Sequence, residues 1–210
     1  MPEPKHFIMT PNAEHSEVTG ILEIVPAIGT WISYLLNQQA VPEFTWDISD
    51  TTGEITATLD DIGTVHKATV YWGNSCGNNI DGLKVTKRRD FRIMNMDSPC
   101  LCGISAQGYC ANLKSFENSR ELEATVENGK RVYRASIDAP EDGRYVAFFI
   151  DIKYEKIDAV VPGAGLDPHY HGFMPVNAPG QLEFTTEVSV WPNTFPYDDC
   201  TNEECDGDLV

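Results

Sequence analysis

The spacing of apolar residues changes from a helical period to a strand period near Pro42, and this change constrains the fold more than any other feature of the sequence. Upstream of it, apolar residues recur at intervals of 4, 3, 4 and 3, giving a stripe made of Ile21, Val25, Ile28, Ile32 and Leu35. This spacing predicts an amphipathic helix over residues 21–36. Residues 5–10 form a short apolar run that predicts a buried strand. Residues 1–40 therefore predict a strand, a loop and a helix.

Downstream of Pro42, apolar and polar residues alternate with a period of two. Such runs occur at residues 44–48, 55–59, 66–72, 91–94, 133–137, 146–155 and 182–190. Alternation indicates strands with one buried and one wet face, as in antiparallel sheets. Seven such strands predict a mainly β domain over residues 42–199, a sandwich of the immunoglobulin or fibronectin-III type. Residues 95–121 and 158–180 are expected to be long loops, and residues 200–210 an acidic tail.

The charge balance excludes several classes of partner. The 210 residues carry 32 acidic and 15 basic side chains, a formal net charge of −17. Nucleic-acid binders need a basic surface, and so do proteins that dock on anionic membranes. No apolar run approaches the roughly 18 residues that cross a bilayer. The sequence predicts no nucleic-acid partner, no membrane insertion and no cofactor. The acidity fits a soluble extracellular protein, or a surface that recruits a cationic partner or calcium.

The cysteines indicate an oxidising compartment. Their number is even, and they form two groups in loop-like sequence: Cys76, Cys100, Cys102 and Cys110, then Cys200 and Cys205. Such a pattern predicts disulfides, although six cysteines allow 15 pairings. A zinc site is the alternative, but its usual CxxC or Cys/His spacings are absent. The first residues contain no export signal, so we expect a secreted protein whose natural N-terminal part is missing from this chain.

One histidine has the setting of a catalytic base. His15 lies between the expected first strand and the helix, where many α/β-hydrolases present the general base of a Ser-His-Asp triad. A surface loop histidine is the alternative. No G-x-S-x-G motif occurs in the chain, and the nearest approach, around Ser105, lacks the second glycine at the required offset. A base without a nucleophile has nothing to activate, so we expect no turnover from this chain alone.

Several segments resemble the C-terminal part of the PhoPQ-activated pathogenicity-related family, whose eukaryotic members include autocrine proliferation repressor A-like proteins. These segments are FIMTPNAEHS, VPEFTW, KRRDFRI, AFFIDIKY and LEFTTEVSVWPNTFPYDD. The resemblance implies that residues 1–40 are the end of an α/β-hydrolase-like domain and that a β-rich domain follows. It also implies that His15 holds the triad-histidine position, with the nucleophile and acid upstream of Met1.

A second histidine motif offers a weak metal-site candidate. His169 and His171 are two residues apart and Asp167 is close by, so on a strand the three could bind a transition metal. The surrounding glycines and prolines indicate a polar surface loop instead, and we predict no metal.

Three functions are compatible with the sequence. The first is an extracellular binding and signalling module of a secreted, autocrine proliferation repressor-like protein, with a cell-surface protein as a partner. The second is a fragment of a serine-hydrolase-like enzyme that supplies the triad histidine. The third is a structural accessory domain. In each reading, the upstream hydrolase-like domain of the full-length protein is a partner.

Overall fold

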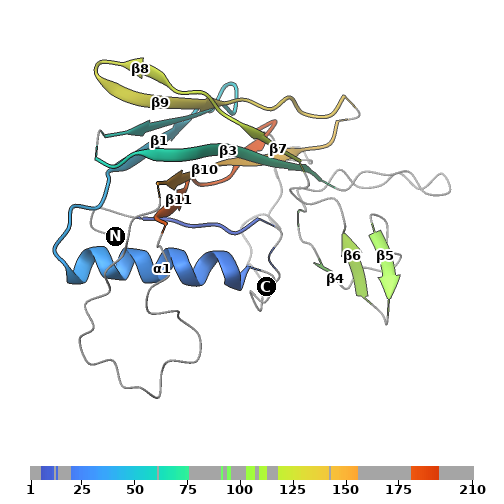
Figure 1. Ribbon diagram of the computed structural model, residues 1–210. Helices are drawn as coiled ribbons and strands as arrows, with labels where there is room; N and C mark the ends of the chain where they lie inside the picture. Colours follow the sequence, from blue (N-terminus) through green and yellow to red (C-terminus); the bar gives the residue numbers. More distant parts are fainter. Residues whose placement is uncertain are drawn as a thin grey trace, which may run out of the picture.

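The protein has a mainly β architecture with one helix, as seen in a computed structural model (Figure 1). The structure describes residues 6–11, 13, 20–60, 62–75, 91, 94–95, 103–106, 109–112, 118–141, 143–155 and 181–193. Two antiparallel sheets stack on each other, and helix α1 (Ile21–Leu36) lies beneath the lower sheet. The two-layer antiparallel fold is therefore confirmed. No helix of the described part is long and apolar enough to cross a membrane.

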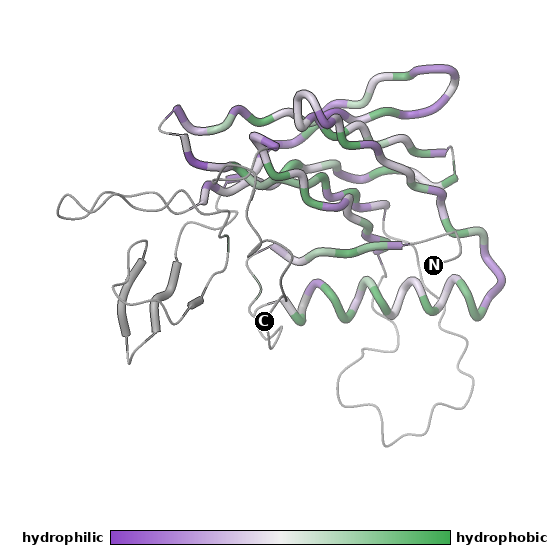
Figure 2. Tube along the Cα trace, turned by 180° about the vertical axis from the view of Figure 1, so that it is seen from behind, coloured by the Kyte–Doolittle hydropathy of each residue, from purple (hydrophilic) through white to green (hydrophobic). Residues whose placement is uncertain are grey.

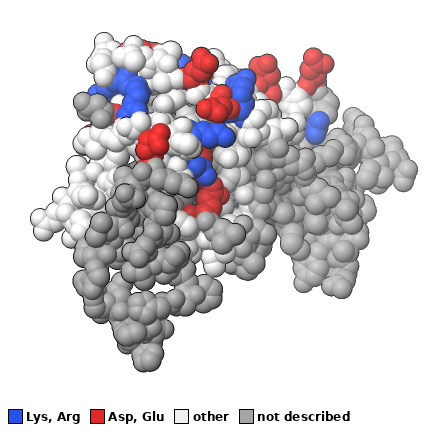
Figure 3. Space-filling model, in the orientation of Figure 1, with Lys and Arg blue, Asp and Glu red and all other residues white. Residues whose placement is uncertain are grey.

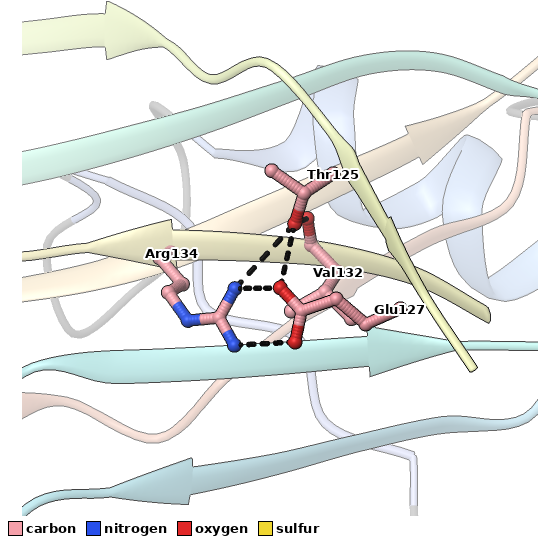
Figure 4. A network of polar contacts seen from close by, with 4 residues as sticks. All are labelled: Thr125, Glu127, Val132 and Arg134. Carbon is pink, nitrogen blue, oxygen red and sulfur yellow. Dashed lines mark hydrogen bonds and ion pairs between the residues drawn. The ribbon is translucent and has the colours of Figure 1, made fainter. Parts of the chain in front are cut away.

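The upper sheet consists of two hairpins. Its strands are β1 (Phe44–Ile48), β2 (Ile55–Leu59), β9 (Lys130–Ala135) and β8 (Thr125–Glu127), in that spatial order. Asn128 and Gly129 connect β8 to β9 with φ values of 51° and 78°. This is the Asn-Gly turn that matches the twist of antiparallel strands. Arg134 and Glu127 form a two-pronged ion pair across the hairpin, and Thr125 joins them (Figure 4). The Arg134 hydrogen bond and then that of Thr125 lower the pKa of Glu127 to about 2.

The lower sheet is organised around one central strand, β10 (Val146–Tyr154), which pairs with three other strands. Its strands are β11 (Glu183–Thr185), β10, β3 (Val65–Asn74) and β7 (Asn118–Glu121), and β12 (Ser189–Trp191) also pairs with β10. A third, small sheet contains β4 (Met94–Asn95), β6 (Tyr109–Asn112) and β5 (Gly103–Ala106). On the visible face of the stacked sheets, acidic and basic side chains are intermixed (Figure 3).

The main core lies between the two large sheets. Alternate residues of β10 point into it, namely Val146, Phe148, Ile150 and Ile152, and all four are fully buried. They meet Ile55, Ala57 and Leu59 of β2. Burial of each large apolar side chain contributes about 1.5–3 kcal/mol. The period-two alternation seen in the sequence thus identifies the residues that hold the layers together.

The strand count is where the sequence prediction fails. The two large sheets contain four and five strands rather than seven in all, and short strands occupy parts of the expected 95–121 loop. The predicted 182–190 strand divides into β11 and β12. Two residues lie between Phe148 and Asp151, whereas three lie between their partners, Ser189 and Thr185. The extra residue is a β-bulge, which alternation in sequence does not reveal.

Helix α1 has the predicted bounds, with Pro26 inside it, but its apolar stripe faces away from the sandwich. The side chains of Ile21, Ile28, Ile32, Leu35 and Leu36 are 44–71% exposed, whereas Ala27, Thr30 and Ser33 are buried. Figure 2 shows the largely apolar residues of this helix along the lower edge of the molecule. The predicted first strand is an extended segment at residues 6–10 with no strand assignment. Its Phe7 carbonyl accepts a hydrogen bond from the Thr185 amide at 2.8 Å.

Candidate functional site

A cluster of charged side chains lies on the outer face of the lower sheet, between this sheet and α1. Because strand residues alternate, Asp151 and Lys153 of β10 point away from the main core. Glu183 of β11 lies opposite Lys153 in the ladder, and its Oε1 is 3.2 Å from Lys153 Nζ. Glu23, in the first turn of α1, pairs with the same ammonium at 2.5 Å, and Asp151 Oδ2 is 3.9 Å from it. The ammonium group of Lys153 therefore lies close to three carboxyl groups, which come from β10, β11 and α1.

Burial and mutual repulsion hold protons on two of these carboxyl groups. Asp151 is 2% exposed and Glu183 is 7% exposed. Burial raises the pKa of Asp151 to about 7, because the nearby Lys153 charge opposes this rise only in part. Burial, and then the Asp151 charge, raise the pKa of Glu183 to about 9. Burial lowers the pKa of Lys153, but Glu23, Asp151 and Glu183 outweigh that effect, so its pKa is raised and it stays charged.

The cluster has incomplete hydrogen bonding. Both carboxyl oxygens of Asp151 are buried and no nitrogen donor lies within hydrogen-bond geometry of them, although the Glu183 carboxyl group is close enough to share a hydrogen bond with Asp151. Glu183 Oε1 is within ion-pair distance of Lys153, but outside hydrogen-bond geometry. Buried carboxyl oxygens without donors are costly, and such groups concentrate where a protein binds something.

A pocket of about 270 Å³ opens beside the cluster, between the N-terminal segment, α1 and β11. Its walls include His6, Phe7, Ala27, Trp31 and Phe184, and Glu183 supplies its carboxyl group. The His6 ring packs on Phe184 and on Trp31, with centroids 4.7 and 6.1 Å away. Burial lowers the pKa of His6, which favours the neutral imidazole. The buried indole Nε1 of Trp31 has no hydrogen-bond partner.

The residues singled out in the sequence lie almost entirely outside the described part. This holds for His15, for His169, His171 and Asp167, and for five cysteines, namely Cys76, Cys100, Cys102, Cys200 and Cys205. Of Cys110 only the backbone is described, in β6, where it pairs with Asn95 and Ser105. Within the described residues, no group of three or more His, Cys, Asp or Glu side chains is arranged to hold a metal ion.

The buried cluster was missed because alternation assigns polar residues to water. Asp151, Lys153 and Glu183 all fall on the polar side of their runs. One signal was present: residues 146–150 read VAFFI, an unbroken apolar run that is typical of a strand buried on both faces. The next residue, Asp151, therefore follows a strand segment with no wet face.

Together the fold and site define a two-layer antiparallel β protein with a buried ionisable cluster and a small apolar pocket under an N-terminal helix. Residues 1–92 match the family model described as PhoPQ-activated pathogenicity-related protein. These residues are less than half of the chain, and the match agrees with the sequence resemblance to this family. It is also 28% identical over 209 residues, 97% of its length, to autocrine proliferation repressor protein A of Dictyostelium discoideum.

The match covers only part of that relative. This chain spans 35% of the length of the Dictyostelium protein. No solved structure matches the chain.

Proposed function

We propose that this chain is the C-terminal portion of a secreted, autocrine proliferation repressor-like protein and acts there as an extracellular binding and signalling module. In this proposal residues 1–40 complete an α/β-hydrolase-like domain, and residues 42–199 form an immunoglobulin-like sandwich that contacts a cell-surface protein. Nucleic acid and the membrane interior are not among its partners. The name of the Dictyostelium relative, autocrine proliferation repressor protein A, supports the signalling role.

The outward stripe of α1 is the observation that carries this proposal. Five large aliphatic side chains, Ile21, Ile28, Ile32, Leu35 and Leu36, are each at least 44% exposed on a single 16-residue helix. Contiguous apolar surface on a soluble protein marks a site of contact with other protein. We assign the hydrolase-like part of the longer protein as the occupant, because the curated relative is almost three times as long as the matched region.

The sandwich supports a binding role rather than a catalytic one. Its core consists of interdigitated apolar side chains from two sheets, and its buried ionisable cluster contains an ammonium and carboxyl groups but no hydroxyl or thiol nucleophile hydrogen-bonded to a base. His15 remains our proposed contribution to a triad whose other members belong to the longer protein. This chain alone is expected to lack turnover.

A chimera tests the proposal. This chain replaces the matched region of the Dictyostelium protein, and the chimera carries either the native stripe or the double substitution Ile32→Asp and Leu35→Asp. We expect the native chimera to be secreted in folded form and to slow cell proliferation. The double variant should be retained or degraded, because two carboxylates cannot be buried at an apolar contact. Secretion is measured by immunoblot of the medium, and proliferation by cell counts.

A matched control places the same charge outside the stripe. Gln38→Asp together with Gln39→Asp adds two carboxylates at exposed positions just after α1 and should leave secretion unchanged. Equal secretion of the stripe variant and this control would show that α1 does not dock. A secreted chimera that leaves proliferation unaffected would instead contradict the signalling role while leaving the docking intact.

A further inference from the structure

We propose that the pocket beneath α1 binds a small organic amine with an aromatic or aliphatic body, whose ammonium group pairs with the Glu183 carboxylate. The proposal rests on the pocket and the adjoining cluster, and the pocket shares Ile28 with the outer stripe of α1.

The residues that line the pocket favour a ligand with an apolar body. Phe7, Ala27, Trp31 and Phe184 line the space together with Ile8 and Ile28, and burial lowers the pKa of His6. Small-molecule sites are typically concave, mostly apolar and equipped with a few polar groups that fix orientation. A volume of about 270 Å³ admits a ligand the size of one aromatic ring with a short side chain. The faces of Trp31 and Phe184 also attract cations.

The charges of the cluster favour a ligand with a cationic head group. Glu23, Asp151 and Glu183 face a single ammonium, that of Lys153, so the fully ionised cluster is short of positive charge. Glu183 is 7% exposed and lines the pocket, and its Oε1 lies 3.2 Å from Lys153 Nζ. The raised pKa of Glu183 means that its carboxyl group keeps its proton at pH values at which an ordinary glutamate is ionised. The site therefore favours a positive charge beside this carboxyl group. An ammonium group that donates hydrogen bonds takes the place of that proton.

Other ligand classes fit less well. An anion would meet the excess of carboxyl groups. A metal ion would need several convergent ligands, and no such group exists among the described residues.

The experiment compares 2-phenylethylamine with 2-phenylethanol, which has the same body and no charge, by isothermal titration calorimetry on the full chain. We expect the amine to bind with a Kd of about 1 mM or tighter, and the alcohol at least about tenfold more weakly. Glu183→Gln should weaken the amine at least about tenfold and leave the alcohol unchanged. The control is Glu155→Gln, an exposed carboxylate at the end of β10, which should change neither affinity.

A second measurement does not depend on any variant folding. Because the amine replaces a proton on Glu183, binding near pH 7 should release a proton, and the observed enthalpy should vary with the ionisation enthalpy of the buffer. The other titratable or charged groups that face the cluster are Glu23, Asp151, Lys153, Lys67 and Tyr71. Amine affinity no better than that of the alcohol, absence of proton release, or an undiminished affinity in Glu183→Gln would each overturn the proposal.

Discussion

Two turn glycines have the same backbone conformation but different surroundings. Gly53 and Gly129 have φ values of 70° and 78°, in the left-handed region that favours glycine. A Cβ on Gly53 would lie 2.8 Å from Cε3 of Trp191, whereas nothing lies within 4 Å of a Cβ on Gly129. The Gly53 carbonyl also accepts a 2.7 Å hydrogen bond from the Ser189 hydroxyl, which joins the β1–β2 turn to β12.

We therefore expect different costs for the same substitution. Gly129→Ala should lower the free energy of unfolding by about 1 kcal/mol through backbone strain alone. Gly53→Ala should lower it by about 2–4 kcal/mol, because Trp191 must also move. Urea unfolding of the two variants provides the comparison. Equal losses would show that Trp191 yields freely and does not fix the turn.

The raised pKa values of Asp151 and Glu183 make stability depend on pH. Each group binds its proton more tightly in the folded chain than in the unfolded chain, where pKa values near 4 apply. Their stabilising effect is complete below about pH 4 and is lost as the pH rises through about 7 and then about 9. The free energy of unfolding should therefore fall by several kcal/mol between pH 5 and pH 9.

Variants separate this effect from the rest of the chain. Denaturant unfolding at pH 5, 7 and 9 should show a flatter profile for the double variant Asp151→Asn and Glu183→Gln, since neither amide titrates. The exposed Glu127 works in the opposite sense, because its pKa is lowered to about 2 and its contribution is lost only in strong acid. A profile of the double variant as steep as that of the native chain would assign the pH dependence elsewhere.

At the scale of the strands, the bulge between β11 and β12 depends on one hydroxyl. Thr186 Oγ1 accepts the Ile150 amide at 3.0 Å and donates to the Glu187 carbonyl at 2.9 Å. The Thr186 amide in turn donates to the Ile150 carbonyl at 2.9 Å. The side chain thus completes a ladder that the extra residue would otherwise interrupt.

The neighbouring threonine offers a matched control. Thr185 and Thr186 are both fully buried, but Thr185 Oγ1 has no hydrogen-bond partner. We expect Thr186→Val to cost about 1–3 kcal/mol of unfolding free energy, because the Ile150 amide loses its acceptor. Thr185→Val should be neutral or stabilising, since it removes an unsatisfied buried hydroxyl. Thermal unfolding monitored by circular dichroism measures both, and a reversed order would contradict the assigned hydrogen bonds.

The elements also show what periodicity can and cannot predict. Periodicity predicted β1, β2 and α1 at their observed residues. It succeeded there because local backbone geometry alone decides which side chains share a face. It could not predict which way the α1 stripe points or that a helix covers the polar side of β10, because both depend on packing between segments distant in sequence. The Asp151–Glu183 cluster was therefore invisible to alternation, although the apolar run before Asp151 was a usable signal.

For the whole molecule, the cysteines test the extracellular proposal. We predict that Cys200 pairs with Cys205, and that Cys76, Cys100, Cys102 and Cys110 form two further bridges in which Cys100 and Cys102 have different partners. Each bridge should stabilise the fold by about 2–4 kcal/mol. Mass spectrometry of a non-reduced digest identifies the pairs. Free thiols at most of the six positions would contradict both the bridges and the secreted location.

The central position of β10 affects how its backbone amides can become exposed to solvent. It pairs with β3, β11 and β12, and eight of its nine residues, all except Lys153, are buried. No local fluctuation can expose its amides without separating the two layers, so their hydrogen exchange should report global unfolding alone. Lys153 and Asp151 belong to the same strand as the core residues Ile150 and Ile152. A cation that binds to the cluster between the lower sheet and α1 would contact the same strand that holds the core, so we expect it to slow the hydrogen exchange of the β10 amides.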